Sequence, residues 1–200
     1  MNRERHPDRE KWNRKYREKV VPDFSSSALF FALEEKVSPT NLLDGDVLEL
    51  ACGASGTALA LAHQGRRVMA VDISDVGIDL LIEESKRQNL ADKIEPVKAD
   101  LIGWFPPRKG FSLVICSFYW DRRVFEHACR WVMPGGYLAW EAFSLEEQKY
   151  RSRFPAIYCT KENEPESLLP ESFTIIECRT IDDGRSASKR LIARRRTIQG

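Results

Sequence analysis

The sequence lacks a long apolar run, has few histidines and contains no close cysteine pair, and each absence excludes a class of protein. No apolar segment approaches the roughly 20 residues that a membrane-spanning helix needs. The charged opening MNRERHPDREKWNRKYREK lacks the apolar stretch of a secretory signal peptide. The five cysteines form no Cys-x-x-Cys pair, and none of the three histidines has a Cys or His neighbour at ligand spacing. We therefore expect a cytoplasmic protein with reduced thiols, no metal site and no membrane partner.

Internal repeats and Gly/Ser-rich linkers are also missing. The 200 residues are enough for one domain with a substantial core, and the apolar content of 42% is that of a soluble globular protein. A net charge of +1 gives no electrostatic reason to expect a nucleic-acid partner. We expect a single domain over residues 1–200, as a monomer or homodimer.

Apolar periodicity predicts helices that alternate with strands. Trp12, Tyr16 and Val20 lie four residues apart and would share one helix face. Pro96 makes its strand an edge or irregular strand, and Asp182-Asp183-Gly184 predicts a turn between the last two strands. We expect helices at residues 1–20, 25–37, 57–65, 75–90 and 122–132, and strands at 46–50, 66–71, 93–99, 111–118, 173–181 and 186–195. Residues 133–143 are expected to form a turn followed by a strand.

This order predicts an α/β fold with helices on both faces of a mostly parallel sheet. The short link between the last two strands requires antiparallel pairing, so we expect one antiparallel strand in a seven-stranded sheet. Ligand-binding loops would then lie at the carboxyl ends of the parallel strands.

The loop ACGASG, after the first strand, is rich in small residues that let the backbone approach a ligand. It does not follow the Gly-x-Gly-x-x-Gly pattern of dinucleotide-binding loops, and the acid Glu49 just upstream disfavours a pyrophosphate and suits a cation. Asp72 ends the second strand, where an acid can accept hydrogen bonds from ribose hydroxyls. A ligand with a ribose, a positive charge and no phosphate is S-adenosylmethionine.

Several motifs resemble, in order and spacing, those of class I S-adenosylmethionine-dependent methyltransferases. They are VLELACGASG, Asp72, KAD ending at Asp100, LVICSFYW and VMPGGYLAWE. The resemblance covers roughly residues 40–145 and implies the Rossmann-like fold and the cofactor of that class. Ala51 and Ser55 stand where the loop of that class has glycines. KWNRKY and EAFSLEEQKYRSRFP further resemble the small tellurite-resistance and thiopurine methyltransferase-like group, which implies an N-terminal helical cap over residues 1–40 and a catalytic core over residues 41–200.

The resemblance also implies the roles of individual residues. Asp72 would bind the ribose, Asp100 the adenine amino group, and the loop the methionine part of the cofactor. The full predicted cofactor set is Trp12, Tyr16, Glu49, Ala51, Cys52, Gly53, Asp72, Ile73, Ala99, Asp100, Leu101, Ser117 and Phe118.

Some of these roles have alternatives of equal weight. Glu49 would hold the cofactor's ammonium group or simply order the loop, and Trp12 and Tyr16 would form a lid or merely dock a helix. The predicted acceptor-binding residues are Tyr119, Trp120 and Glu141, the last of which suits a structural acid equally well.

We expect a small-molecule methyltransferase acting by in-line transfer. No catalytic base stands out, which favours a soft or already ionised acceptor. Alternatives are a methyltransferase for protein or nucleic acid and a non-catalytic S-adenosylmethionine-binding protein. A nicotinamide-dependent oxidoreductase shares the architecture, but the loop composition disfavours it.

Overall fold

The computed structural model describes residues 6–38 and 41–197, which divide into two compact units. The first unit combines Met1–Ser27 with Asp46–Phe105, and the second combines Ala28–Gly45 with Pro106–Gly200. The single domain with a cap over residues 1–40 stays a prediction, and residues 1–5, 39 and 40 of that cap lie outside the described residues. Within the described ranges, no helix is long and apolar enough to cross a bilayer.

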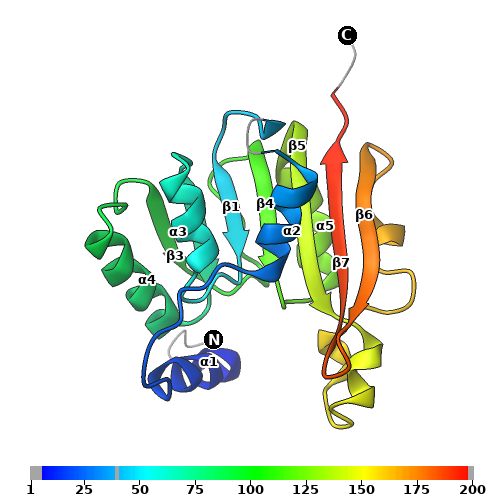
Figure 1. Ribbon diagram of the computed structural model, residues 1–200, viewed down its shortest axis with the longest axis horizontal. Helices are drawn as coiled ribbons and strands as arrows, with labels where there is room; N and C mark the ends of the chain where they lie inside the picture. Colours follow the sequence, from blue (N-terminus) through cyan, green and yellow to red (C-terminus); the bar gives the residue numbers. More distant parts are fainter. Residues whose placement is uncertain (1–5, 39–40, 198–200) are drawn as a thin grey trace. The chain divides into compact units, whose positions relative to one another are not determined.

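The first unit is built on parallel strands with helices between them (Figure 1). Strands β1 and β2 are buried throughout, as their apolar sequences predict, whereas β3 is largely exposed and contains Pro96. Since β3 ends the strand order, the expectation of an edge strand is confirmed. The elements are α1 (Pro7–Arg17), β1 (Val47–Leu50), α3 (Gly56–His63), β2 (Val68–Asp72), α4 (Asp75–Arg87) and β3 (Ile94–Lys98).

In the second unit, β4 pairs with β5 in parallel, and β7 pairs antiparallel with both β5 and β6. Asp183 accepts bonds from the amides of Arg185 and Ser186, which forms the predicted turn before β7. The elements are α2 (Ala28–Lys36), β4 (Phe111–Ser117), α5 (Arg122–Trp131), β5 (Val132–Phe143), η3 (Leu145–Lys149), η4 (Ala156–Tyr158), η5 (Glu166–Leu168), β6 (Phe173–Asp182) and β7 (Ala187–Arg195).

The strand order β3-β2-β1-β4-β5-β7-β6 confirms the expected α/β fold, with its seven strands and one antiparallel strand set in near the end. Most element ends differ by one to three residues from the expected bounds, and two of these differences have a clear physical cause. Helix α1 ends at Arg17 rather than near residue 20, and Val20 is 98% exposed because it lies beyond the helix and packs on nothing. Strand β5 begins at Val132, before the expected turn, because an irregularity in its pairing with β4 lets Gly135 fit inside the strand.

Candidate functional site

The loop after β1 adopts a left-handed backbone at two positions. Gly53 has φ +57°, which glycine tolerates, but Ala51 has φ +51° in the place where the sequence motif has glycine. An alanine in this region costs about 1 kcal/mol or more. Hydrogen bonds hold the two ends of the loop. The Cys52 amide donates to the Val71 carbonyl at 3.1 Å, and Ser55 caps α3 by accepting a bond from the Ala58 amide at 2.9 Å.

Glu49 is buried behind this loop. Its carboxylate oxygens lie 2.8 and 2.7 Å from the Ser55 hydroxyl, which donates to them while it caps α3. Burial, together with the nearby Asp72 charge, raises the pKa of Glu49 to about 8 even though the Ser55 bond opposes the shift. These contacts order the loop, which was one of the alternatives for Glu49; the ammonium-binding role stays a prediction.

Asp72, at the end of β2, joins the loop to α4. One carboxylate oxygen accepts from the Gly53 amide at 2.9 Å and the other from the Ser74 amide at 2.7 Å. Burial raises the pKa of Asp72 to about 6, while the backbone bonds act in the opposite direction. Each oxygen keeps a second lone pair that can accept a hydroxyl. Asp72 therefore suits the predicted ribose site.

The turn after β3 lies beside Asp72. The Ala99 amide donates to the Asp72 carbonyl at 2.9 Å, and Asp100 accepts from the Ile102 amide at 2.9 Å. Leu101 is buried, whereas the Asp100 side chain is 35% exposed and lies 3.4 Å from His6. The structure thus brings together the residues predicted to bind ribose and adenine.

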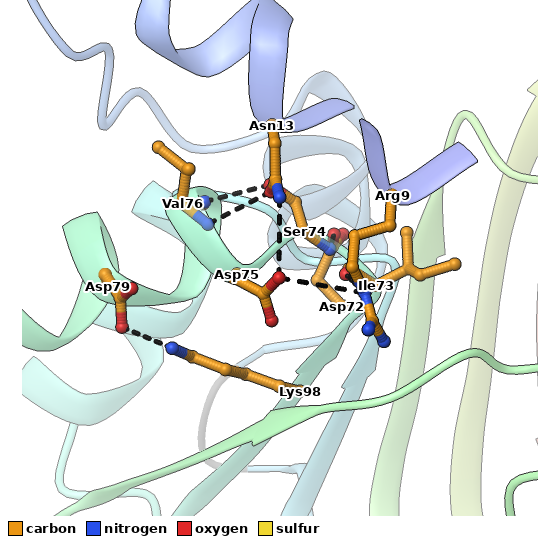
Figure 2. Close-up of polar contacts among 10 residues, drawn as sticks. Arg9, Asn13, Asp72, Ile73, Ser74, Asp75, Val76, Asp79 and Lys98 are labelled. Carbon is orange, nitrogen blue, oxygen red and sulfur yellow. Dashed lines mark hydrogen bonds and ion pairs between the residues drawn. The ribbon is translucent and has the colours of Figure 1, made fainter. Parts of the chain in front are cut away.

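Polar side chains of α1 dock this helix on the segment where β2 ends and α4 begins (Figure 2). Arg9 Nε donates to the Ile73 carbonyl at 3.1 Å. Asn13 Oδ1 accepts from the Ser74 hydroxyl at 2.7 Å and from the Val76 amide at 3.2 Å, and Asn13 Nδ2 donates to Asp75 at 3.4 Å. The sequence prediction missed Arg9 and Asn13, since one polar residue in a charged helix carries no local signal of docking.

Tyr16 and Trp12, both predicted at the cofactor site, have different surroundings. The Tyr16 ring lies against Gly53 and Gly77: a Cβ at position 53 would be 1.7 Å from the Tyr16 hydroxyl, and one at position 77 would be 2.9 Å from the ring. Burial, followed by the Asp72 charge, raises the pKa of Tyr16. Trp12 is 37% exposed beneath Lys15, whose Nζ is 4.3 Å from the ring centroid.

In the second unit, Ser117 ends β4 and Phe118 follows it. Phe118 has φ +57°, and its amide donates to the Glu141 carbonyl at 2.7 Å. Its ring is 48% exposed and lies 4.9 Å from the Phe143 ring. A bulky side chain in this conformation costs about 1–2 kcal/mol, and such strain is concentrated at functional sites.

The residues predicted to bind the acceptor belong largely to the packing of the second unit. Tyr119 accepts a bond at its carbonyl from the Trp140 indole at 2.9 Å, and Trp120 is buried edge-on to Trp140. Glu141 is buried and accepts from Ser188 and Arg190, each at 2.8 Å. Their acceptor-binding roles stay predictions, and the ion pair supports a structural role for Glu141.

Within the described ranges, no cluster of three or more His, Cys, Asp or Glu side chains could hold a metal ion.

Comparisons with known proteins agree with this geometry. Residues 47–136 match the family model described as "Methyltransferase domain". Magnesium protoporphyrin IX methyltransferase (ChlM) from Synechocystis, solved with bound SAH, is similar in structure with a TM-score of 0.71 at 16% identity, over 94% of this chain and 97% of that one. TehB from Haemophilus influenzae has a TM-score of 0.71 at 16% identity, over 94% of this chain and 67% of that one.

A curated relative is named for a different substrate. The 23S rRNA (uracil(1939)-C(5))-methyltransferase RlmD of Aeromonas salmonicida is 38% identical over 76 residues, which cover 36% of this chain and 17% of that protein. Residues 47–136, just under half of the chain, are thus similar to methyltransferase domains, and the likeness to ChlM, solved with bound SAH, is one of fold. The likeness to TehB, from the group predicted from the sequence, is one of fold.

Replacing the strained alanine should stabilise the loop. We expect Ala51→Gly to raise the free energy of unfolding by about 0.5–1 kcal/mol, because glycine adopts φ +51° without strain and this outweighs its greater freedom in the unfolded chain. Urea denaturation measures the change. The matched control Ala54→Gly, at a loop position without positive φ, should lower stability; equal effects of the two variants would contradict the strain.

The buried carboxyls should make the ligand-free protein less stable as pH rises. Because their folded pKa values, about 8 for Glu49 and about 6 for Asp72, exceed those of the unfolded chain, the folded state binds more protons. The contribution of these two carboxyls to stability is fully present below about pH 4 and is lost towards pH 8, with a slope of up to about 1.4 kcal/mol per pH unit for each carboxyl. In Glu49→Gln, urea denaturation between pH 5 and 8 should show a flatter profile. The exposed control Glu162→Gln should keep the wild-type slope.

Loss of Asn13 should release α1 from the loops. Asn13→Ala leaves the Ser74 hydroxyl and the Val76 amide without their acceptor, at a cost of about 1–3 kcal/mol. Limited trypsin digestion followed by mass spectrometry should then show faster cleavage within Pro7–Arg17. The exposed control Glu10→Ala should be cleaved as slowly as wild type; unchanged cleavage of Asn13→Ala would show that other contacts hold the helix.

Proposed function

We propose that the protein transfers a methyl group from S-adenosylmethionine to a small-molecule acceptor. The observation that carries this proposal is Asp72, whose buried carboxylate is held by the Gly53 and Ser74 amides at the end of β2. An acid in this place, with lone pairs to spare, suits a ribose better than a pyrophosphate. The glycine at position 53 lets Tyr16 of α1 pack directly against the loop backbone, because a Cβ there would be 1.7 Å from the Tyr16 hydroxyl.

Different residues of the first unit bind different parts of the cofactor. Asp72 accepts from the ribose hydroxyls, Asp100 accepts from the adenine amino group, and the backbone of Ala51 and Gly53 faces the methionine part. Glu49 fixes the loop through Ser55. When bound, the cofactor supplies a methyl group on a sulfonium that leaves as a neutral thioether. The protein's own part is orientation and exclusion of water.

A small acceptor is supported by the net charge and by one structural neighbour. A net charge of +1 gives no overall electrostatic attraction to a nucleic acid, and the ChlM neighbour is named for magnesium protoporphyrin IX. Glu141, the acid predicted in the acceptor pocket, is already bonded to Arg190 and Ser188 and is therefore a poor base. This favours an acceptor that is ionised before it binds.

Methylation of RNA is the second candidate, because the curated relative RlmD is named for 23S rRNA. That likeness covers 17% of the relative. An RNA substrate would require affinity for RNA that falls steeply with salt.

Calorimetric titration with S-adenosylhomocysteine tests the cofactor site. We expect micromolar affinity for the wild type and at least tenfold weaker binding for Asp72→Asn, because the amide sets a donor against the Gly53 or Ser74 amide and removes the charge. The matched control Asp79→Asn, which breaks only the exposed pair with Lys98 seen in Figure 2, should bind as wild type does. Thermal melts of each variant show that the fold is intact.

Other outcomes decide between the candidates. Equal affinity of the two Asp variants, or binding of NADH instead, would refute the assignment of Asp72. If the cofactor binds, a screen of thiols, metalloid oxyanions, small amines and an rRNA fragment for uptake of labelled methyl separates the two substrate classes. Tight cofactor binding with no methyl uptake by any of them would favour the non-catalytic protein.

A further inference from the structure

A row of aromatic rings begins at the end of β4 and continues past β5. The ring centroids of Phe118 and Phe143 are 4.9 Å apart, those of Phe143 and Phe154 are 4.9 Å apart, and those of Phe154 and Tyr158 are 6.4 Å apart. We call these four residues the aromatic row. Phe118 is 48% exposed and Tyr158 is 36% exposed, so the row reaches the surface at both ends.

A guanidinium group is fixed against the middle of the row. Arg151 lies 4.6 Å from the Phe143 centroid and 4.3 Å from the Phe154 centroid. Its Nε is bonded to Glu147, a fully buried carboxylate that also accepts from the Ser186 hydroxyl and the Ala187 amide. The Nη groups form no hydrogen bond within the described part of the chain, and half of the Arg151 side chain is exposed.

The surface beside this arginine is concave and positively charged. An open depression of about 440 Å³ is lined by Tyr150, Arg151, Ser152, Arg153, Phe154 and Pro155. Arg153 is exposed and forms no ion pair with a described residue.

Phe118 holds its ring at the exposed end of the aromatic row in a strained backbone conformation. Its φ of +57° is unfavourable for a bulky residue, and the half-exposed ring gains little from burial in return. Backbone strain that packing does not offset is typical of functional sites rather than of protein cores.

We propose that the aromatic row, with Arg151 and Arg153, binds the methyl acceptor, and that this acceptor is a planar aromatic molecule carrying an anionic group. This inference rests on the proposed function. The rings offer edge and face contacts to a flat ligand. The free Nη groups of Arg151 and the nearby Arg153 pair with a carboxylate, sulfonate or phosphate. An aliphatic acid would lose the ring contacts, and a neutral aromatic molecule would lose the ion pair.

Three matched probes test this chemistry: 2-naphthoate, the neutral 2-naphthamide and the saturated decahydro-2-naphthoate. Calorimetry with and without S-adenosylhomocysteine should show 2-naphthoate binding at least tenfold more tightly than either analogue. Equal affinity for all three, or no binding of 2-naphthoate, would overturn the proposal. If the protein binds 2-naphthoate but not S-adenosylhomocysteine, the aromatic row is not an acceptor site and the proposed function fails as well. If the protein binds S-adenosylhomocysteine but not 2-naphthoate, this inference alone is overturned.

Variants of Phe118 separate a binding role from a structural one. Phe118→Gly and Phe118→Ala both remove the ring, and each should weaken 2-naphthoate binding at least tenfold. Only glycine also relieves the backbone strain, so Phe118→Gly should melt at a higher temperature than Phe118→Ala. The control Phe31→Ala removes a phenylalanine of α2 that is 59% exposed, compared with 48% for Phe118, and should keep wild-type affinity for the probe.

Other results would count against the assignment. Phe118 variants that keep affinity within twofold of wild type would show that the ring does not touch the probe. Sedimentation would reveal a self-associating surface: a dimer that dissociates in Phe118→Gly would make the row an interface between two copies and refute the acceptor site.

Discussion

The carboxylate of Asp72 ties together the loops of the first unit. It ends β2, accepts the amide of Gly53 from the loop after β1, and accepts the amide of Ser74 at the start of α4. Burial of a carboxylate is unfavourable unless backbone donors satisfy it. The glycine loop, the start of α4 and, through the Ala99 amide, the turn after β3 are therefore held around one charge. Each Asp72 carboxylate oxygen keeps a lone pair beyond its backbone bond, and these lone pairs are the ones that the predicted ribose site would use.

Buried carboxylates organise the second unit as well, but with different partners. Glu141 is paired with Arg190 across β5 and β7, and Glu147 receives the Ser186 hydroxyl and the Ala187 amide beside Arg151. A buried ion pair adds little net stability but fixes geometry, because loss of either partner leaves an unpaired charge. In this unit the fixed geometry places a guanidinium on a row of aromatic rings. In both units, a buried carboxylate whose oxygens are hydrogen-bonded fixes the positions of the surrounding residues.

Local signals explain which parts of the fold were predictable. Ser74 and Asp183 act on backbone amides within three residues, so their cap and turn could be inferred from the sequence alone. Pro96 lacks an amide proton, and this chemical fact is enough to assign its strand to the sheet edge. The docking of α1 was not predictable in this way. Its apolar stripe pointed to Trp12, Tyr16 and Val20. Tyr16 does pack on Gly53 and Gly77, but Trp12 is partly exposed, Val20 lies beyond the helix, and buried Asn13 provides the polar contacts.

The sequence by itself determined the order of helices and strands, the acid at the end of β2 and the small residues of the loop, because each depends on neighbours a few positions away. Only the tertiary structure decided what those residues touch. Tyr16 lies on Gly53, Glu141 meets Arg190, and Phe118 meets Phe143, across separations that no periodicity encodes. Contacts of this kind form when the chain packs, and their partners are chosen by the geometry of the sheet rather than by spacing along the chain.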